Sequence, residues 1–104
     1  SIIHNIAMAK GYWITTGTIH TPLGMVPYLS ELTDWLPTVD GKFLIRDISS
    51  DVREGDPGTV VVIIEFPSIE QAISAYESEQ YQAMFQLRTN HSDLTLTISE
   101  ALDS

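Results

Sequence analysis

The chain has 104 residues, of which 43% are hydrophobic and 18% charged, so we expect one compact domain with a modest core. Fourteen acidic against five basic side chains give a net charge of -9, which repels phosphate backbones and anionic membrane surfaces and argues against a nucleic acid partner. The sequence has no cysteine and no apolar run long enough for a membrane span, which excludes disulfides and thiolate metal sites and argues against membrane insertion.

The first nine residues lack the basic and apolar regions of a secretory signal, and we expect a cytoplasmic protein. We interpret residues 1–9 as an N-terminal extension, with a short lead-in strand as the alternative. Residues 10–104 then form a single domain.

The first half of this domain reads as strand, helix, strand. Aromatic and β-branched residues predict a strand over residues 11–18. After the helix-entry signal Thr21-Pro22, regular helix is expected to begin at Pro27 and to end at Pro37. Its predicted buried stripe comprises Val26, Leu29, Leu32, Thr33 and Leu36.

A second strand is predicted over residues 42–50, and a polar loop over residues 51–58 returns the chain into a third. That third strand, residues 60–64, is continuously β-branched, as expected for a central strand covered on both faces. Pro67 ends it. Ser68, followed three residues later by Gln71, forms a capping-box pattern that predicts a helix from Ile69.

The remaining segments are helical and then extended. The helix from Ile69 carries a predicted apolar stripe of Ile69, Ala72, Ile73 and Tyr76. Ser78 is expected to cap a further helical piece that contains Tyr81, Met84, Phe85 and Arg88. Leu94, Leu96 and Ile98 alternate with polar residues and predict a fourth strand with one apolar face.

The order β-α-β-β-α-β is that of an α+β, ferredoxin-like fold, with a four-stranded antiparallel sheet and both helices on one side. The strands are apolar on both faces, so the side without helices needs a cover. We therefore predict a homodimer formed through that open side of the sheet.

The chain also resembles a known family. The segments that carry the resemblance are Lys-Gly-Tyr-Trp at 10–13, Gly-Lys-Phe-Leu-Ile-Arg at 41–46, Val-Arg-Glu-Gly at 52–55, Glu-Phe-Pro-Ser at 65–68 and Tyr-Glu-Ser-Glu-Gln-Tyr at 76–81. These segments are similar to domain-of-unknown-function family 1330 (DUF1330). The resemblance implies a dimeric α/β barrel akin to antibiotic-biosynthesis monooxygenases and muconolactone isomerases, and it implies no established activity.

Few residues point to chemistry. His4, His20 and His91 are far apart in sequence and match no metal-binding pattern, and we predict neither a metal nor a cofactor. His20 follows the first strand and could transfer a proton, but a solvated or helix-capping histidine is the preferred interpretation. His20 and Arg46 are the two weak catalytic candidates.

Arg46 lies within a strand, between Leu44 and Ile48 on its predicted face, and we expect it to be partly buried. It either forms a structural ion pair with Glu65 or binds a ligand anion between sheet and helices. Arg88 either binds a ligand anion from the second helical region or stabilises the C-terminus of its helix through the helix dipole. The candidate ligand-binding residues are Tyr12, Tyr28, Arg46, Glu65, Tyr76, Tyr81 and Arg88.

Two functions fit this pattern. The first is a non-catalytic dimeric module that binds a small organic anion. The alternative is a cofactor-independent isomerase or monooxygenase-like enzyme that acts on a small aromatic or unsaturated acid.

Overall fold

A computed structural model describes residues 9–102, so most of the predicted extension, residues 1–9, lies outside the described part. Four antiparallel strands form one sheet in the order β2-β3-β1-β4. The elements are β1 (Gly11–Ile19), a 3-10 turn (Pro22–Met25), α2 (Val26–Trp35), a second 3-10 turn (Leu36–Val39), β2 (Lys42–Asp47), β3 (Val60–Phe66), α3 (Ile69–Glu77), α4 (Glu79–Met84), a third 3-10 turn (Phe85–Leu87) and β4 (Ser92–Glu100).

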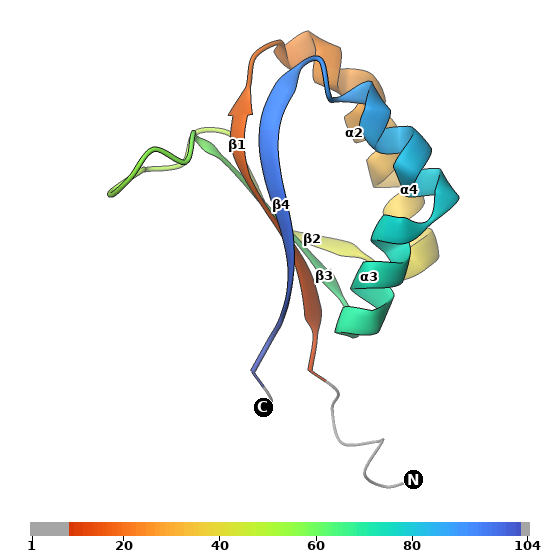
Figure 1. The fold of residues 1–104 in the computed structure, drawn as a ribbon. Helices are drawn as coiled ribbons and strands as arrows, with labels where there is room; N and C mark the ends of the chain where they lie inside the picture. Colours follow the sequence, from red (N-terminus) through yellow and green to blue (C-terminus); the bar gives the residue numbers. More distant parts are fainter. Residues whose placement is uncertain (1–8, 103–104) are drawn as a thin grey trace, which may run out of the picture.

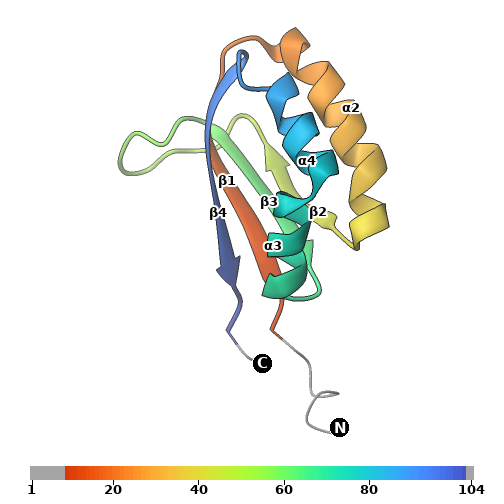
Figure 2. The same cartoon turned by 45° about the vertical axis from the view of Figure 1, so that its right-hand side comes forward.

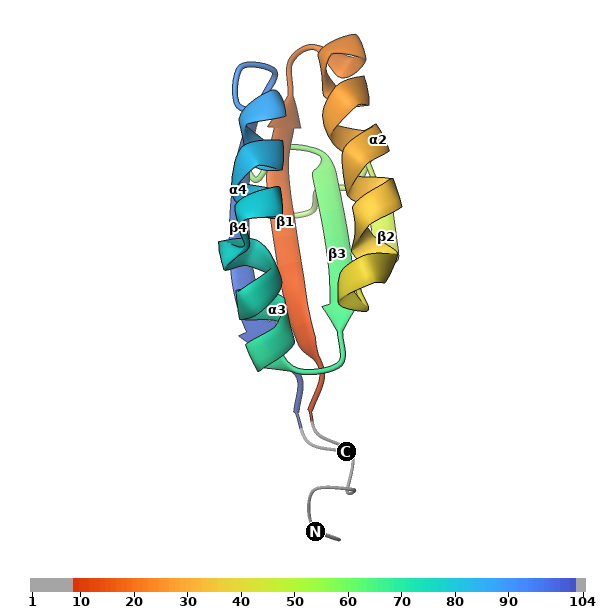
Figure 3. The same ribbon diagram turned by 90° about the vertical axis from the view of Figure 1, so that its right-hand side faces the viewer.

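The helices α2, α3 and α4 all lie on one face of the sheet, and the other face is open (Figure 1 and Figure 3). This arrangement confirms the predicted α+β, ferredoxin-like fold, although the sheet is not closed into a barrel within one chain. No helix among the described residues combines the length and apolar character needed to cross a membrane.

Helix α3 begins where the sequence predicts, because the Ser68 hydroxyl oxygen accepts a hydrogen bond of 3.2 Å from the backbone N–H of Gln71. Its buried side chains are Ala72 and Ala75, whereas Ile73, predicted to be buried, is 39% exposed. Small residues face the sheet because the helix starts almost in contact with β1: a Cβ added at Gly11 would lie 2.5 Å from the Ile69 Cα.

Helix α2 begins at Val26, one residue before the predicted start, and Pro27 occupies its first turn. Tyr28, Leu32 and Leu36 are buried at a spacing of four residues. Val26, which is 55% exposed, and Thr33, also exposed, do not belong to this stripe as predicted.

Pro37 does not end the helical segment either, because it is tolerated in the first turn of the 3-10 segment Leu36–Val39. The segment ends at Asp40, which has a left-handed backbone with φ of 59°.

Strand β2 ends at Asp47, three residues before the predicted end, and the loop between β2 and β3 protrudes from the domain (Figure 2). A β-bulge interrupts the register between Phe43 and Ile45. Beyond the bulge, Arg46 pairs with Val62 of β3, whose side chain faces the helices. The bulge therefore turns Phe43 and Arg46 to the same face of the sheet, where simple alternation would place Leu44 with Arg46.

Candidate functional site

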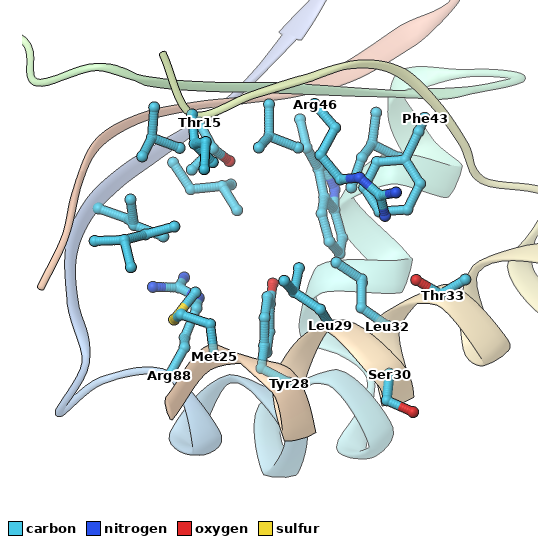
Figure 4. Close-up of a pocket in the computed structure, with 18 of the residues that line it drawn as sticks. Thr15, Met25, Tyr28, Leu29, Ser30, Leu32, Thr33, Phe43, Arg46 and Arg88 are labelled. Atoms are coloured by element: carbon cyan, nitrogen blue, oxygen red, sulfur yellow. The ribbon is translucent and has the colours of Figure 1, made fainter. Parts of the chain in front are cut away.

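A cavity of about 660 Å³ lies between α2 and the helix-covered face of the sheet (Figure 4). All four strands contribute to its walls, which are mostly apolar, as Met25, Leu29, Val62 and Leu96 illustrate. Its size falls within the range of small-molecule sites, roughly 300 to 1,000 Å³. Such a lining would hold an apolar or aromatic body and would leave specificity to a few polar groups.

Arg88 is the most unusual of those polar groups, because it is only 8% exposed and forms no ion pair with any residue between 9 and 102. Its guanidinium carbon lies 5.4 Å from the centre of the Tyr28 ring and 5.8 Å from that of Phe85. Its Nε atom has no hydrogen-bond partner within the described part of the chain. The side chain points into the cavity beside Met25 and Tyr28 (Figure 4).

The position of Arg88 is fixed by its backbone. Its N–H donates to the carbonyl oxygen of Phe85, and its own carbonyl accepts a hydrogen bond of 2.9 Å from the Ser92 hydroxyl at the start of β4. The turn between the last helical segment and β4 thus fixes the backbone from which the Arg88 side chain extends into the cavity. The predicted role at a helix C-terminus does not account for a burial this deep.

Tyr28 and Tyr81 form a buried hydroxyl pair beside this arginine, with 2.8 Å between their oxygen atoms. Burial and the neighbouring Tyr81 hydroxyl raise the pKa of Tyr28 well above its usual range, although Arg88 opposes the shift. Burial lowers the pKa of Arg88, but Tyr81 and Tyr28 more than offset this effect, and the net pKa is raised. At neutral pH the site therefore combines the charged guanidinium of Arg88 with the neutral hydroxyl of Tyr28. When Tyr81 donates to Tyr28, the Tyr28 proton is free to bind a ligand oxygen.

Arg46 lines the cavity from β2, and its guanidinium carbon lies 4.9 Å from the centre of the Phe43 ring. It is exposed, so the predicted partial burial beside Leu44 is wrong within one chain, because the bulge places Phe43 next to it instead. Ile48 and Val26, both exposed, also line the cavity and mark its mouth together with Arg46.

The ion pair considered between Arg46 and Glu65 does not form, because Glu65 lies on the open face of the sheet. The Tyr12 hydroxyl donates to the Glu65 carboxylate at 3.0 Å, and this hydrogen bond raises the pKa of Tyr12. The ammonium groups of Lys10 and Lys42 each lie 3.9 Å from the same carboxylate. Tyr12 and Glu65 are therefore separated from the cavity by the sheet.

The other candidate residues lie in the core or at the surface. Tyr76 and Tyr81 pack their rings around Trp13, at 5.9 and 4.7 Å between ring centres, and do not line the cavity. His20 is hydrogen-bonded to Asp93 at an exposed position, which agrees with the interpretation as a solvated histidine. Between residues 9 and 102, no three His, Cys, Asp or Glu side chains cluster in a way that could hold a metal ion.

Of the seven predicted ligand-binding residues, the structure places Tyr28, Arg46 and Arg88 around the cavity. Sequence reasoning missed Phe43, the aromatic support of Arg46, and Asp34, the one carboxylate among the described lining residues. A bulge inside a strand leaves no clear trace in sequence, so Phe43 could not be assigned to this face. Asp34 lies six residues after Tyr28 on α2, a spacing that puts the two side chains on different sides of the helix, so a helical projection from the buried stripe would not have found it.

The fold and cavity define a small ferredoxin-like α+β protein, and a comparison with family models places it more narrowly. Residues 10–102 match the model of a domain of unknown function (DUF1330). The chain therefore belongs to the DUF1330 family. A search of curated proteins found no match.

Several solved structures share the fold. A protein of unknown function from Rhodopseudomonas palustris superposes with a TM-score of 0.71 at 13% identity, covering 98% of this chain and 89% of that one. SnoaB, a cofactor-independent oxygenase from Streptomyces nogalater, gives a TM-score of 0.62 at 14% identity, covering 92% and 96%. A dimeric protein of unknown function from Bacteroides fragilis, with a ferredoxin-like fold, gives 0.60 at 7% identity, covering 88% and 96%. At these identities the similarity establishes the fold alone.

Proposed function

We propose that this protein is a homodimer that binds a small organic anion in the cavity between α2 and the sheet. The observation that carries the proposal is Arg88, a buried guanidinium that faces the cavity and has no carboxylate partner among the described residues. A buried donor without an acceptor costs about 1 to 3 kcal/mol, and more when it is charged. A ligand carboxylate would balance the charge of the Arg88 guanidinium and would form charge-assisted hydrogen bonds with it.

The surroundings of Arg88 select the kind of anion. Tyr28 offers a hydroxyl beside the guanidinium and a ring on the cavity wall, while Met25, Leu29 and Leu96 offer apolar contact. A small aromatic or unsaturated acid combines the carboxylate and the apolar body that this lining fits. The net charge of -9 disfavours anions at long range, so affinity must come from these local contacts.

The binding proposal is tested by calorimetric titration of the protein with benzoate and cinnamate, using benzamide and cinnamamide as uncharged controls of the same shape. We expect the acids to bind and the amides to fail. Arg88→Met should abolish binding of the acids, whereas Arg53→Met, which removes an equal charge from an exposed loop position, should leave it unchanged. Equal binding of acids and amides, or no binding of a wider set of organic acids at millimolar concentration, would contradict the proposal.

The homodimer proposal rests on the open face of the sheet, where Ile14, Val61 and Ile63 are partly exposed and Ile45 is 43% exposed. A second copy packed face to face would cover these side chains, as in a dimeric α/β barrel. The Bacteroides fragilis protein of the same fold is dimeric, which supports this assembly.

Light scattering tests the dimer directly. Ile63→Asp places a carboxylate in the proposed interface and should convert the dimer to a monomer. Leu23→Asp makes the same kind of change at a residue that is 85% exposed on the helix side and should leave the dimer intact. A monomeric wild-type protein at micromolar concentration would exclude this assembly.

The alternative, a cofactor-independent isomerase or monooxygenase-like enzyme, has less support. The fold is shared with SnoaB, and the same cavity could hold an aromatic substrate. However, no histidine belongs to the described cavity lining, and Asp34 is its one carboxylate, so a general base beside Arg88 is not evident. Turnover of a bound aromatic acid in the presence of oxygen would favour this alternative.

A further inference from the structure

The five basic residues of the chain are unevenly partnered. Three of them lie within 4.0 Å of a carboxylate: Lys10, Lys42 and Arg53. The other two, Arg46 and Arg88, form no ion pair within residues 9–102, and both line the same cavity. In a protein with fourteen acidic side chains, two such arginines around one cavity call for a ligand-based explanation.

The two guanidinium groups lie on opposite sides of the cavity and at different depths. Figure 4 shows Arg88 beside Met25 and Tyr28, and Arg46 across the cavity beside Phe43. Arg88 is buried at the inner end, whereas Arg46 is exposed at the mouth. A single carboxylate held by Arg88 would therefore leave Arg46 without an acceptor.

Both guanidinium groups are supported by aromatic rings. Arg88 lies over Tyr28 and Phe85, and Arg46 lies over Phe43 at 4.9 Å. Such stacking limits the positions that a flexible arginine side chain adopts and leaves its N–H groups available to a planar acceptor. The wall between them is apolar, with Val62, Ile64 and Leu29 among its residues.

The geometry points to a ligand with two acidic groups, one at each end of an apolar body. This inference rests on the proposed function and deepens it, because the inner acid is the anion already assigned to Arg88. The outer acid binds Arg46 at the mouth of the cavity, and the apolar body lies between them. The ligand class is therefore a dicarboxylate with an aromatic, unsaturated or short aliphatic spacer.

Matched acids test the second acidic group. Calorimetric titrations compare benzoate with terephthalate, hexanoate with adipate, and octanoate with suberate, for the wild type and for Arg46→Met. We expect Arg46→Met to weaken the best diacid about two- to fivefold and its matched monoacid by less than about twofold, since one exposed charge contact is lost. Arg53→Met removes the same charge outside the cavity and should change neither affinity. Because Arg46 is exposed, circular dichroism should show an unchanged fold.

Salt provides an independent measurement. The wild-type affinity for the diacid should fall more steeply with ionic strength than that for the monoacid, and Arg46→Met should remove this difference. If monoacids and diacids bind alike and Arg46→Met affects both equally or neither, the inference of a second acidic group on the ligand is wrong. The proposed anion site at Arg88 is not contradicted by that result. If no acid of either kind binds the wild type, the proposed function fails as well.

Discussion

Replacement of Arg88 by methionine separates a ligand-binding arginine from a structural one, because the two roles predict different stabilities. Arg88→Met removes a guanidinium whose Nε has no hydrogen-bond partner among the described residues, and this change alone should raise the free energy of unfolding by about 1 to 3 kcal/mol. It also removes the stacking on Tyr28 and Phe85, each ring contributing about 0.5 to 1 kcal/mol. The two effects nearly cancel. We expect the free energy of unfolding to change by less than about 1 kcal/mol.

A structural role predicts a much larger change. Removing one member of a buried ion pair costs about 3 to 5 kcal/mol, because the remaining charge is left buried and unpaired. Arg88 has no such partner within residues 9–102, and methionine can fill most of the volume that its stem occupies. The variant should therefore fold normally and lose only the ligand.

The assay is urea unfolding followed by circular dichroism, at one fixed protein concentration because the stability of the proposed dimer would depend on concentration. Each protein is measured with and without benzoate at 100 times its dissociation constant for the wild type. The ligand should stabilise the wild type by about 2.7 kcal/mol and Arg88→Met not at all. Arg88→Lys keeps the charge without the planar fork and should bind more weakly than the wild type. A loss of 3 kcal/mol or more in ligand-free Arg88→Met would refute the reasoning and make Arg88 a structural residue.

Three further predictions concern stability and are measured by the same urea unfolding. Gly11→Ala should cost about 1 to 3 kcal/mol, because the new Cβ would lie 2.5 Å from the backbone of Ile69; an unchanged midpoint would contradict this packing. Ser68→Ala should cost about 1 kcal/mol through the lost cap to Gln71, whereas Ser68→Asp, which can still accept that hydrogen bond, should cost less. Because the pKa of Tyr28 is raised in the folded protein, the stability that its neutral hydroxyl contributes is complete below pH 10 and is lost as the pH rises above that value. Tyr28→Phe should therefore reduce the fall of the free energy of unfolding above pH 10 by up to about 1.4 kcal/mol per pH unit. Equal slopes of stability against pH for the two proteins would contradict this prediction.

The elements that sequence predicted best are those fixed by local chemistry. Ser68 caps α3 and Ser78 caps α4 through hydrogen bonds to amides three residues further on, and both interactions are encoded within four residues of sequence. The alternation of Leu94, Leu96 and Ile98 likewise gave the correct face of β4, since side chains alternate strictly in a regular strand. The ferredoxin-like order followed from these elements.

What sequence did not predict depends on contacts between distant segments. Ile73 was expected in the core, but α3 approaches Gly11 closely and turns the small residues Ala72 and Ala75 toward the sheet, which leaves Ile73 39% exposed. The bulge before Ile45 changed the neighbour of Arg46, because one extra residue shifts every later side chain to the other face. Periodicity describes a single element and carries no information about either effect.

The candidate site depends on the same long-range packing. Arg88 was one of seven candidates on sequence grounds, and its deep burial beside Tyr28 could not be known before α2 and the end of the last helical segment were placed together. Once they are placed, the candidates divide by side of the sheet. Tyr12 and Glu65 lie on the open face, where the proposed dimer would form, and the two arginines without an ion-pair partner between residues 9 and 102 line the cavity.

The cavity itself follows from the unequal packing of α3 and α2 against the same face of the sheet. Under α3, Gly11 and Ala72 bring backbone close to backbone, and the Trp13 indole N–H donates to the Ala72 carbonyl at 2.8 Å. Under α2, the large side chain of Tyr28 stands between helix and sheet, and its hydroxyl is held by Tyr81. Close contact on one side and bulky spacers on the other leave an opening that apolar residues line but do not fill. This opening also contains Arg88, a buried cation without an ion-pair partner between residues 9 and 102, and a charge in such surroundings costs free energy, which is the physical basis for the proposed anionic ligand.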